Sequence, residues 1–176
     1  ATPKEAAMLA GIGCTDIVLA YPIVGPQVDR VIELKRNYPD VTLRVIADDP
    51  GAIAALNEAC DAAGVKFDVL VDMNTGMDRT GSLPGDPTLR LARLINDAPA
   101  LAFAGLHIYD GHVGGVNEEE RRVSALASIQ FGTDTRTLIE EAGIPVEEVA
   151  ASGSRAFDVT TGVDGVDSVS PGTWIF

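Results

Sequence analysis

Short runs of apolar, often β-branched residues alternate along this chain with longer stretches rich in alanine, leucine and glutamate. Residues 16–22 (DIVLAYP) and 67–74 (FDVLVDMN) are typical of the short runs, and most of these runs are nearly continuous in apolar residues. Such continuity indicates strands that are buried on both faces, as in a parallel sheet. The alternation therefore predicts a chain of βα units.

The pattern predicts six strands and five helices. The strands are expected at residues 16–22, 42–48, 67–74, 101–109, 147–152 and 167–176. The helices are expected at about 3–11, 26–38, 50–64, 88–98 and 118–143. The connections are short and rich in Gly, Pro and Asp, with no linker or low-complexity tract. We therefore expect residues 1–176 to form a single domain.

Composition and charge narrow the classes of protein further. Of the 176 residues, 46% are hydrophobic, 22% are charged and only 2 are Cys, which excludes collagen-like, disulfide-stapled and strongly disordered chains. The 13 basic and 26 acidic residues give a formal net charge of -13, spread along the chain. A strongly acidic chain is a poor match for nucleic acid, so we expect no such partner.

The chain shows no membrane or export segment. Its longest apolar runs fall far below the roughly 20 residues of a membrane helix, and no basic stretch followed by an apolar one opens the chain. Cys14 and Cys60 lie in unrelated contexts without a CxxC pair, which suits a reducing compartment. We therefore expect a cytoplasmic protein with no membrane partner.

Right-handed βα units leave two main architectures, an open doubly wound sheet or a (β/α)8 barrel of the TIM type. No GxGxxG or GxxxxGKS/T phosphate loop follows a strand, so the signatures of nucleotide-binding open sheets are missing. Polar residues instead gather where successive strands end, as in barrel active sites. They are Asp48, Asp72, Asn74, Tyr109, Ser152, Ser154, Gly172 and Thr173. This pattern favours the barrel.

Chain length limits that barrel. A complete one takes about 250 residues and eight strands, whereas six strands are visible here. The chain also begins on a helix start, with Thr2 as N-cap and Pro3 in the first turn, and ends inside a strand-like run at 174–176. We therefore expect an α/β fold with a parallel sheet, the central and C-terminal part of an incomplete TIM-type barrel that is truncated at both ends.

An incomplete barrel leaves two unpaired parallel edges, which tend to pair with other chains. One barrel strand is expected ahead of residue 1, because the chain opens on a helix. We expect either further polypeptide that closes the ring or a second copy that covers the gap in a homodimer, and the sequence leaves both open.

Residues 71–81 (VDMNTGMDRTG) form the first candidate site segment. Asp72 ends a buried strand, and Arg79 follows after a turn at Thr75-Gly76. One interpretation is a structural ion pair between Asp72 and Arg79. The other is that the planar guanidinium of Arg79 holds an anionic oxygen, a phenolate or a carboxylate, of a ligand.

Residues 105–115 (GLHIYDGHVGG) form the second segment and contain both histidines of the chain. His107 and Tyr109 alternate on a strand and so project on the same face, while Gly111 lets the backbone turn before His112. A histidine near strand ends is a candidate acid or base, or a group that stacks on a ring. The alternative is an ordinary hydrogen-bonded loop histidine.

Small residues follow the fifth predicted strand, as Ser152-Gly153-Ser154, and lie within the last predicted strand, as Pro171-Gly172-Thr173. They expose backbone N–H groups and add hydroxyl donors, which suit a phosphate dianion where no basic cluster is at hand. Phosphate sites in barrels commonly arise from the loops after strands 7 and 8. As bare motifs these segments are also ordinary turn sequences.

Five segments, in order along essentially the whole chain, carry a family resemblance. They are ATPKEAAMLAGIG, DIVLAYPIVG, VDMNTGMDRTGSLPG, GLHIYDGHV and SPGTWIF. Together they resemble the D-threonine aldolase and D-serine dehydratase group of the alanine-racemase-like, fold-type III pyridoxal phosphate enzymes. The resemblance implies a pyridoxal 5'-phosphate-dependent lyase that cleaves D-threonine-like 3-hydroxy amino acids to glycine and an aldehyde. Alternatives on the same scaffold are a D-serine dehydratase, an amino-acid racemase, and a cofactor-binding barrel without turnover.

The resemblance also implies roles for individual residues. Arg79 would lie near the phenolic oxygen of the cofactor, and Tyr109 near its pyridine ring. His112 would lie near the ring or the substrate hydroxyl, as the general base. The phosphate would be held by small residues of the two loops, which are Ser152, Gly153, Ser154, Gly172 and Thr173.

Two family features are expected outside this chain. The lysine that binds the cofactor covalently lies on the first barrel strand of family members, and Lys4, Lys35 and Lys66 do not replace it. A C-terminal β domain that supplies metal ligands would follow residue 176, so we expect no metal site within residues 1–176 and a divalent metal only in a longer protein. Without the lysine, we expect this chain alone to be inactive.

Overall fold

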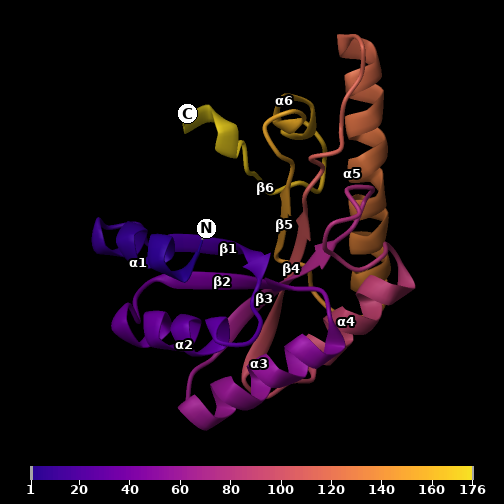
Figure 1. Ribbon diagram of the computed structural model, residues 1–176. Coiled ribbons are helices and arrows are strands. Elements are labelled where there is room, and N and C mark those ends of the chain that lie inside the picture. The colour runs from indigo at the N-terminus through magenta and orange to yellow at the C-terminus, as the bar shows by residue number, and fades with distance from the viewer. Residues whose placement is uncertain (1, 176) are drawn as a thin grey trace.

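The computed structural model describes residues 2–175, the last two of them by their backbone alone. Figure 1 shows a curled sheet with helices along its outer side. The strands are β1 (Asp16–Pro22), β2 (Thr42–Ala47), β3 (Phe67–Met73), β4 (Leu101–Ile108), β5 (Glu148–Ala151) and β6 (Ser168–Val169). The helices are α1 (Pro3–Gly11), α2 (Gln27–Asn37), α3 (Pro50–Ala63), α4 (Asp86–Asn96), α5 (Glu118–Glu141), α6 (Phe157–Thr160) and the 3-10 helix η1 (Gly172–Ile175).

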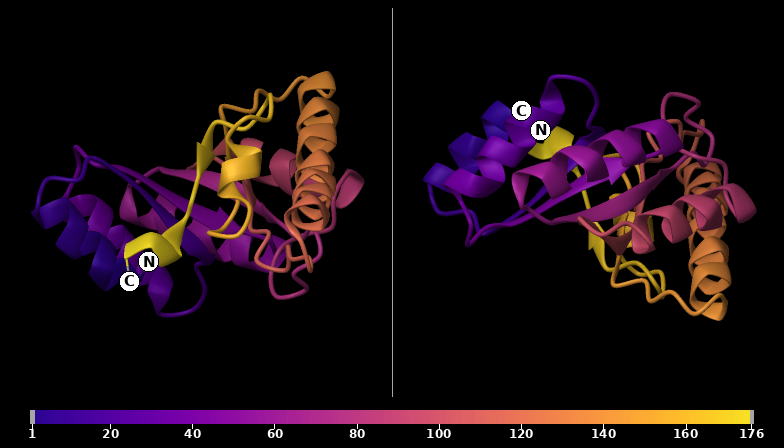
Figure 2. Two further views of the ribbon diagram at one scale, coloured as in Figure 1. Left: turned by 90° about the horizontal axis from the view of Figure 1, so that it is seen from above. Right: turned by 90° about the horizontal axis from the view of Figure 1, so that it is seen from below.

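The strands lie in the sheet in the order in which they follow one another in the chain, and every pairing is parallel. An open doubly wound sheet would reverse its strand order at a switch point. The sequential order is instead that of a barrel, and the two views of Figure 2 show the sheet curling, with helices outside the curl. The predicted incomplete TIM-type barrel is confirmed.

The two faces of the sheet are packed differently. The outer face, which includes Phe67, Val69 and Val71 of β3, belongs to the large apolar core shared with the helices. The inner face holds a small cluster that includes Ile46, Leu70 and Ala150. Because side chains alternate along a strand, Asp72 shares the inner face with Leu70. The polar site residues of β3 therefore project into the curl.

Local signals in the sequence set several helix boundaries. Thr2 caps α1 in a capping box with Glu5, as the opening residues predict. Asp49 caps α3 by accepting the Ala52 N–H at 2.9 Å, and Gly64 ends that helix with a φ of 65°. Among the described residues, no helix is both long and apolar enough to cross a membrane.

The predicted strand at 167–176 is wrong over most of its length. Only Ser168–Val169 pairs with β5, and Gly172–Ile175 forms η1, while Phe176 lies outside the described residues. The Ser170 N–H donates to the carbonyls of both Ala151 and Ser152, at the end of β5. Pro171 has no N–H with which to continue the pairing with β5, so the strand ends there. The four-residue helix α6 was not predicted either.

Candidate active site

Arg79 and Tyr109 meet at the carboxyl ends of β3 and β4. The guanidinium carbon of Arg79 lies 4.7 Å from the centroid of the Tyr109 ring, a cation–π stack. We call this pair the ring side of the site. Within residues 2–175, no hydrogen bond occupies the N–H donors at the edge of the Arg79 guanidinium, and such donors suit an anionic oxygen.

Asp72 does not pair with Arg79. Its Oδ1 binds the His107 Nδ1 at 2.6 Å, and its Oδ2 accepts the Thr80 hydroxyl at 2.7 Å. Asp72 and His107 are nearly fully buried and lie directly opposite each other in the sheet. The structural ion pair with Arg79 was thus the wrong alternative. Asp72 instead ties the segment that carries Arg79 to the strand that leads to Tyr109.

His112 lies exposed on the loop after β4 and packs over Gly76 of the loop after β3. A Cβ added at Gly76 would lie 2.7 Å from the His112 Nε2, and Gly76 has a φ of 131°, so the contact depends on glycine. The imidazole therefore lies between the loops that follow β3 and β4, at the carboxyl ends of these strands. Whether it acts as a base stays a prediction.

The two small-residue loops meet at their tips. The Thr173 N–H donates to the Ser154 Oγ at 2.8 Å. Beside this contact lies a cavity of about 380 Å³, which we call the tip cavity. Its lining residues are Tyr109, Gly153, Ser154, Ser170, Gly172 and Thr173. Sequence reasoning missed Ser170, although its place directly before Pro171-Gly172 was a usable signal.

Ser152 differs from the expectation that its hydroxyl faces an anion. The side chain is buried, donates to the Asp110 Oδ2 at 2.8 Å and accepts the Thr160 hydroxyl at 2.6 Å. Ser152 does not line the tip cavity. Gly153 lines it, but its N–H donates to the Asp110 Oδ1 at 2.8 Å. Asp110 was not singled out from the sequence.

The chemistry of these donors fits a phosphorylated aromatic cofactor. Ser154, Ser170 and Thr173 supply hydroxyl donors at the tip cavity, and a Cβ added at Gly172 would meet nothing within 4 Å, so the backbone there borders open space. Phosphate oxygens accept such donors. Tyr109 adjoins both the tip cavity and Arg79, so one ring links the hydroxyl donors of the tip cavity with the guanidinium of Arg79.

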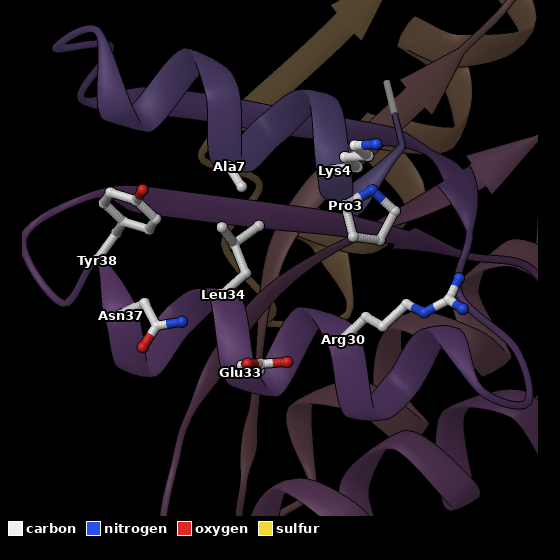
Figure 3. Close-up of a pocket in the computed structure, with 8 residues that line it drawn as sticks. All are labelled: Pro3, Lys4, Ala7, Arg30, Glu33, Leu34, Asn37 and Tyr38. Carbon is white, nitrogen blue, oxygen red and sulfur yellow. The ribbon is translucent and has the colours of Figure 1, made fainter.

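A further cavity of about 320 Å³ lies between α1 and α2 (Figure 3). Figure 3 shows Ala7 and Leu34 pointing toward one another from the two helices, with Tyr38 and Arg30 at opposite ends of the cavity. This cavity belongs to the outer layer of helices, whereas barrel active sites lie where the strands end. We therefore assign the chemistry to the ring side and the tip cavity.

No set of three or more His, Cys, Asp or Glu side chains in the described part of the chain is arranged to hold a metal ion. The three lysines also lie away from the strand ends. Lys4 is in the first turn of α1, Lys35 in α2 donates to the Val41 carbonyl, and Lys66 precedes β3. None of them lines the tip cavity.

Known proteins resemble this chain over most of its length. It is 28% identical to a D-threonine aldolase from Arthrobacter sp. over 163 residues, which are 91% of this chain and 42% of that protein. It is 25% identical to a D-threo-3-hydroxyaspartate dehydratase from Delftia sp. over 99% of this chain and 46% of that protein. The crystal structure of D-threonine aldolase from Filomicrobium marinum superimposes with a TM-score of 0.91 and 30% identity, over 99% of this chain and 47% of that one.

The chain thus spans less than half the length of these relatives. The resemblance to the D-threonine aldolase group of alanine-racemase-like enzymes is confirmed. The family model described as the N-terminal domain of alanine racemase matches residues 1–176. This chain therefore belongs to the alanine racemase N-terminal domain family.

Proposed function

We propose that this chain forms the cofactor-binding part of a pyridoxal phosphate-dependent lyase that cleaves D-threonine-like 3-hydroxy amino acids to glycine and an aldehyde. One observation carries the proposal: Tyr109 lines the tip cavity on one side and stacks with Arg79 on the other. The names of the relatives, D-threonine aldolase and 3-hydroxy-D-aspartate aldolase, support the type of reaction.

When bound, pyridoxal phosphate supplies an electron sink for the bond that breaks at the substrate α-carbon. The protein residues bind and orient it. Ser154, Ser170 and Thr173 hold the phosphate with their hydroxyl groups at the tip cavity. Arg79 would hold the phenolic oxygen and stabilise its negative charge, because its guanidinium presents planar N–H donors that match anionic oxygens.

Tyr109 sets the position of the cofactor ring between these two anchors. Gly111 and Gly153 both lie against the Tyr109 ring, where an added Cβ would come within 2.5 Å of Cε1 and 2.9 Å of Cε2, respectively. The ring is therefore clamped by two backbone segments and cannot rotate freely. A fixed Tyr109 would border the bound cofactor ring and help to exclude water there.

His112 is the general base of this proposal. Cleavage between Cα and Cβ requires removal of the proton from the substrate β-hydroxyl, and imidazole is well suited to accept a proton near neutral pH. His112 is exposed, so a substrate could reach it, and its imidazole packs against Gly76 of the loop after β3.

A second candidate is dehydration of a D-3-hydroxy amino acid on the same site. It is favoured by the Delftia dehydratase, which aligns with 99% of this chain. A variant of that protein has been solved in what is described as its metal-free form, which supports a divalent metal in the longer protein. Cytoplasmic location and a homodimer stay predictions.

Product analysis tests the proposal. The full-length protein is incubated with pyridoxal phosphate and, separately, with D-threonine, D-serine and alanine. Glycine with acetaldehyde from D-threonine supports the lyase. Release of ammonia with a 2-oxo acid identifies the dehydratase instead, and formation of the opposite enantiomer identifies a racemase. A protein that binds the cofactor but turns over none of these substrates contradicts both candidates. Residues 1–176 alone are expected to show no turnover.

A further inference from the structure

Asp110 follows Tyr109 directly after β4, and its side chain is buried, with the residue only 2% exposed. Its two oxygens accept the Ser152 hydroxyl and the Gly153 N–H, each at 2.8 Å. A buried carboxylate is costly unless donors compensate its charge. Both oxygens are therefore committed to the loop after β5, and neither is directed to a ligand.

That loop contains an unusual backbone conformation. Ser152 has a φ of 59°, in the left-handed region that residues other than glycine rarely adopt. Such a conformation persists where surrounding contacts fix it. The Ser152 N–H donates to the Ile108 carbonyl at 2.9 Å, its hydroxyl donates to Asp110, and the Thr160 hydroxyl donates to its Oγ at 2.6 Å. The turn is thus held from β4 and from α6.

The direction of this turn determines whether the tip cavity exists. Immediately after it, Gly153 packs against the Tyr109 ring, and Ser154 accepts the Thr173 N–H. Without the contacts that fix Ser152, the chain would leave β5 in another direction, and Ser154 would not meet Thr173. The hydroxyl donors of the cavity therefore depend on Asp110, which does not line it.

We propose that Asp110 is a positioning residue, which holds Ser152, Gly153 and Ser154 in the shape that binds a phosphate group, without touching the phosphate itself. The inference rests on the proposed function, since it assigns the phosphate of the cofactor to the tip cavity. It differs from a general role in stability, because it concerns the phosphate alone. Pyridoxal, which lacks the phosphate, separates the two roles.

The test compares dissociation constants of the full-length protein for pyridoxal phosphate and for pyridoxal. Asp110→Ala is expected to lower the preference for the phosphorylated form about tenfold or more, the effect of losing charge-assisted hydrogen bonds. Affinity for pyridoxal itself is expected to fall much less than affinity for pyridoxal phosphate, because Gly111 and Arg79 still contact the Tyr109 ring when Gly153 shifts.

Asp110→Asn serves as the conservative rescue. Its amide oxygen can accept the Gly153 N–H, and its amide N–H can donate to Ser152, whose hydroxyl then turns toward Thr160. We expect this variant to keep the phosphate preference within about threefold of wild type, because the loop keeps its shape.

A second pair of variants leaves Asp110 intact. Thr160→Val removes the hydroxyl that donates to Ser152 and is expected to lower the phosphate preference, whereas Thr161→Val removes a neighbouring hydroxyl bonded within α6 and is expected to leave it unchanged. Asp49→Ala is the control for lost stability alone, because it removes the cap of α3 far from the loop. Should Asp110→Ala fail to fold, the threonine pair decides.

The outcomes separate the two levels of argument. A wild-type protein that binds pyridoxal as tightly as pyridoxal phosphate contradicts the proposed function. If the wild-type protein prefers pyridoxal phosphate, the proposed function stands. If the Asp110→Ala and Thr160→Val variants then keep this preference, or lose affinity for both ligands equally, the positioning role of Asp110 is overturned.

Discussion

A buried carboxylate stabilises each of the two parts of the site, but Asp72 binds side chains beside the ring side, whereas Asp110 binds the backbone of the loop beside the tip cavity. Asp72 and Asp110 are each 2% exposed, and each connects the end of β4 with a neighbouring loop. Asp72 binds an imidazole and a threonine hydroxyl, and so steadies the segment that carries the charged side chain of Arg79. Asp110 binds a serine hydroxyl and a backbone N–H, and so steadies main chain.

Under the proposed function, the ring side and the tip cavity would hold their anions in two different ways. The ring side depends on one guanidinium, so it should be sensitive to the identity of one side chain. The tip cavity depends on hydroxyl groups and on backbone shape, so it should be sensitive to anything that changes the path of the loops. The following variants test this contrast.

Replacement of Arg79 should have the largest effect. Arg79→Ala removes both the stack on Tyr109 and the partner of the anionic oxygen, and we expect kcat/KM for D-threonine in the full-length protein to fall by about 100-fold to 1000-fold. Arg79→Lys keeps the charge but not the planar stack, and should recover only part of the loss. Arg90→Ala, an exposed arginine on α4, is the control, and an equal loss there would remove the special role of Arg79.

Removal of the Asp72 carboxylate should act on stability and spare the phosphate. Asp72→Ala leaves His107 and the Thr80 hydroxyl without their acceptor in a buried site, at a cost of about 3 kcal/mol in the free energy of unfolding. Denaturant titration of the full-length protein measures this, with Asp68→Ala at the other end of β3 as the control. The preference for pyridoxal phosphate over pyridoxal should stay at the wild-type value. A loss of that preference would show that Asp72, like Asp110, affects binding of the phosphate, and would contradict the difference that we propose between the two carboxylates.

Much of this fold follows from local sequence. Continuous apolar runs placed β1 to β4 within about one residue of their observed ends, because strands buried on both faces need such runs. Thr2 and Gly64 marked helix ends through capping, which depends on a few neighbouring atoms. The short α6 and the end of β6 were missed, since four-residue elements carry little periodicity.

The site was less accessible because it depends on register between strands. Alternation did not show on which face of β4 His107 lies, and Tyr109 lies one residue beyond the end of the strand. Val69 pairs with Phe103, but the next residue of β3, Leu70, pairs with Gly105. Ala104 is therefore an extra residue in β4, which forms a β-bulge. The bulge moves His107 opposite Asp72 and turns it to the inner face. No local pattern in residues 101–109 specifies that contact.

Crowding at Tyr109 should produce an intermediate effect, shared by both sides of the site. In Gly111→Ala the new methyl group would lie 2.5 Å from the Tyr109 Cε1, so the ring must shift, at a cost of about 2 kcal/mol in the free energy of unfolding. Affinity for pyridoxal phosphate and for pyridoxal should fall together, unlike in Asp110→Ala. Gly162→Ala, where the added methyl group meets only the Val159 carbonyl at 4.0 Å, is the matched control. A Gly111→Ala protein with wild-type stability would show that the ring is not clamped.

The smallest effect should come from removal of the exposed ion pair between Arg121 and Asp158, beside the loop that follows β5. Arg121 in α5 donates to the Arg155 carbonyl and to both oxygens of Asp158. The hydrogen bonds from Arg121 to the Asp158 carboxylate hold its pKa below the usual range. A lowered pKa in the folded state stabilises the protein above the ordinary aspartate pKa, and this contribution is lost as the pH falls through the folded value. Asp158→Asn should therefore lower Tm at pH 7 by no more than about 2 °C, because the carboxylate is half exposed and solvent screens it. The difference from wild type should vanish under strongly acidic conditions, where Asp158 is protonated in both states, while Asp164→Asn should differ little from wild type at either pH. If Asp158→Asn still has a lower Tm than wild type under acidic conditions, the Asp158 side chain stabilises the loop through its hydrogen-bond geometry and not through its charge. Asp158 would then resemble Asp110.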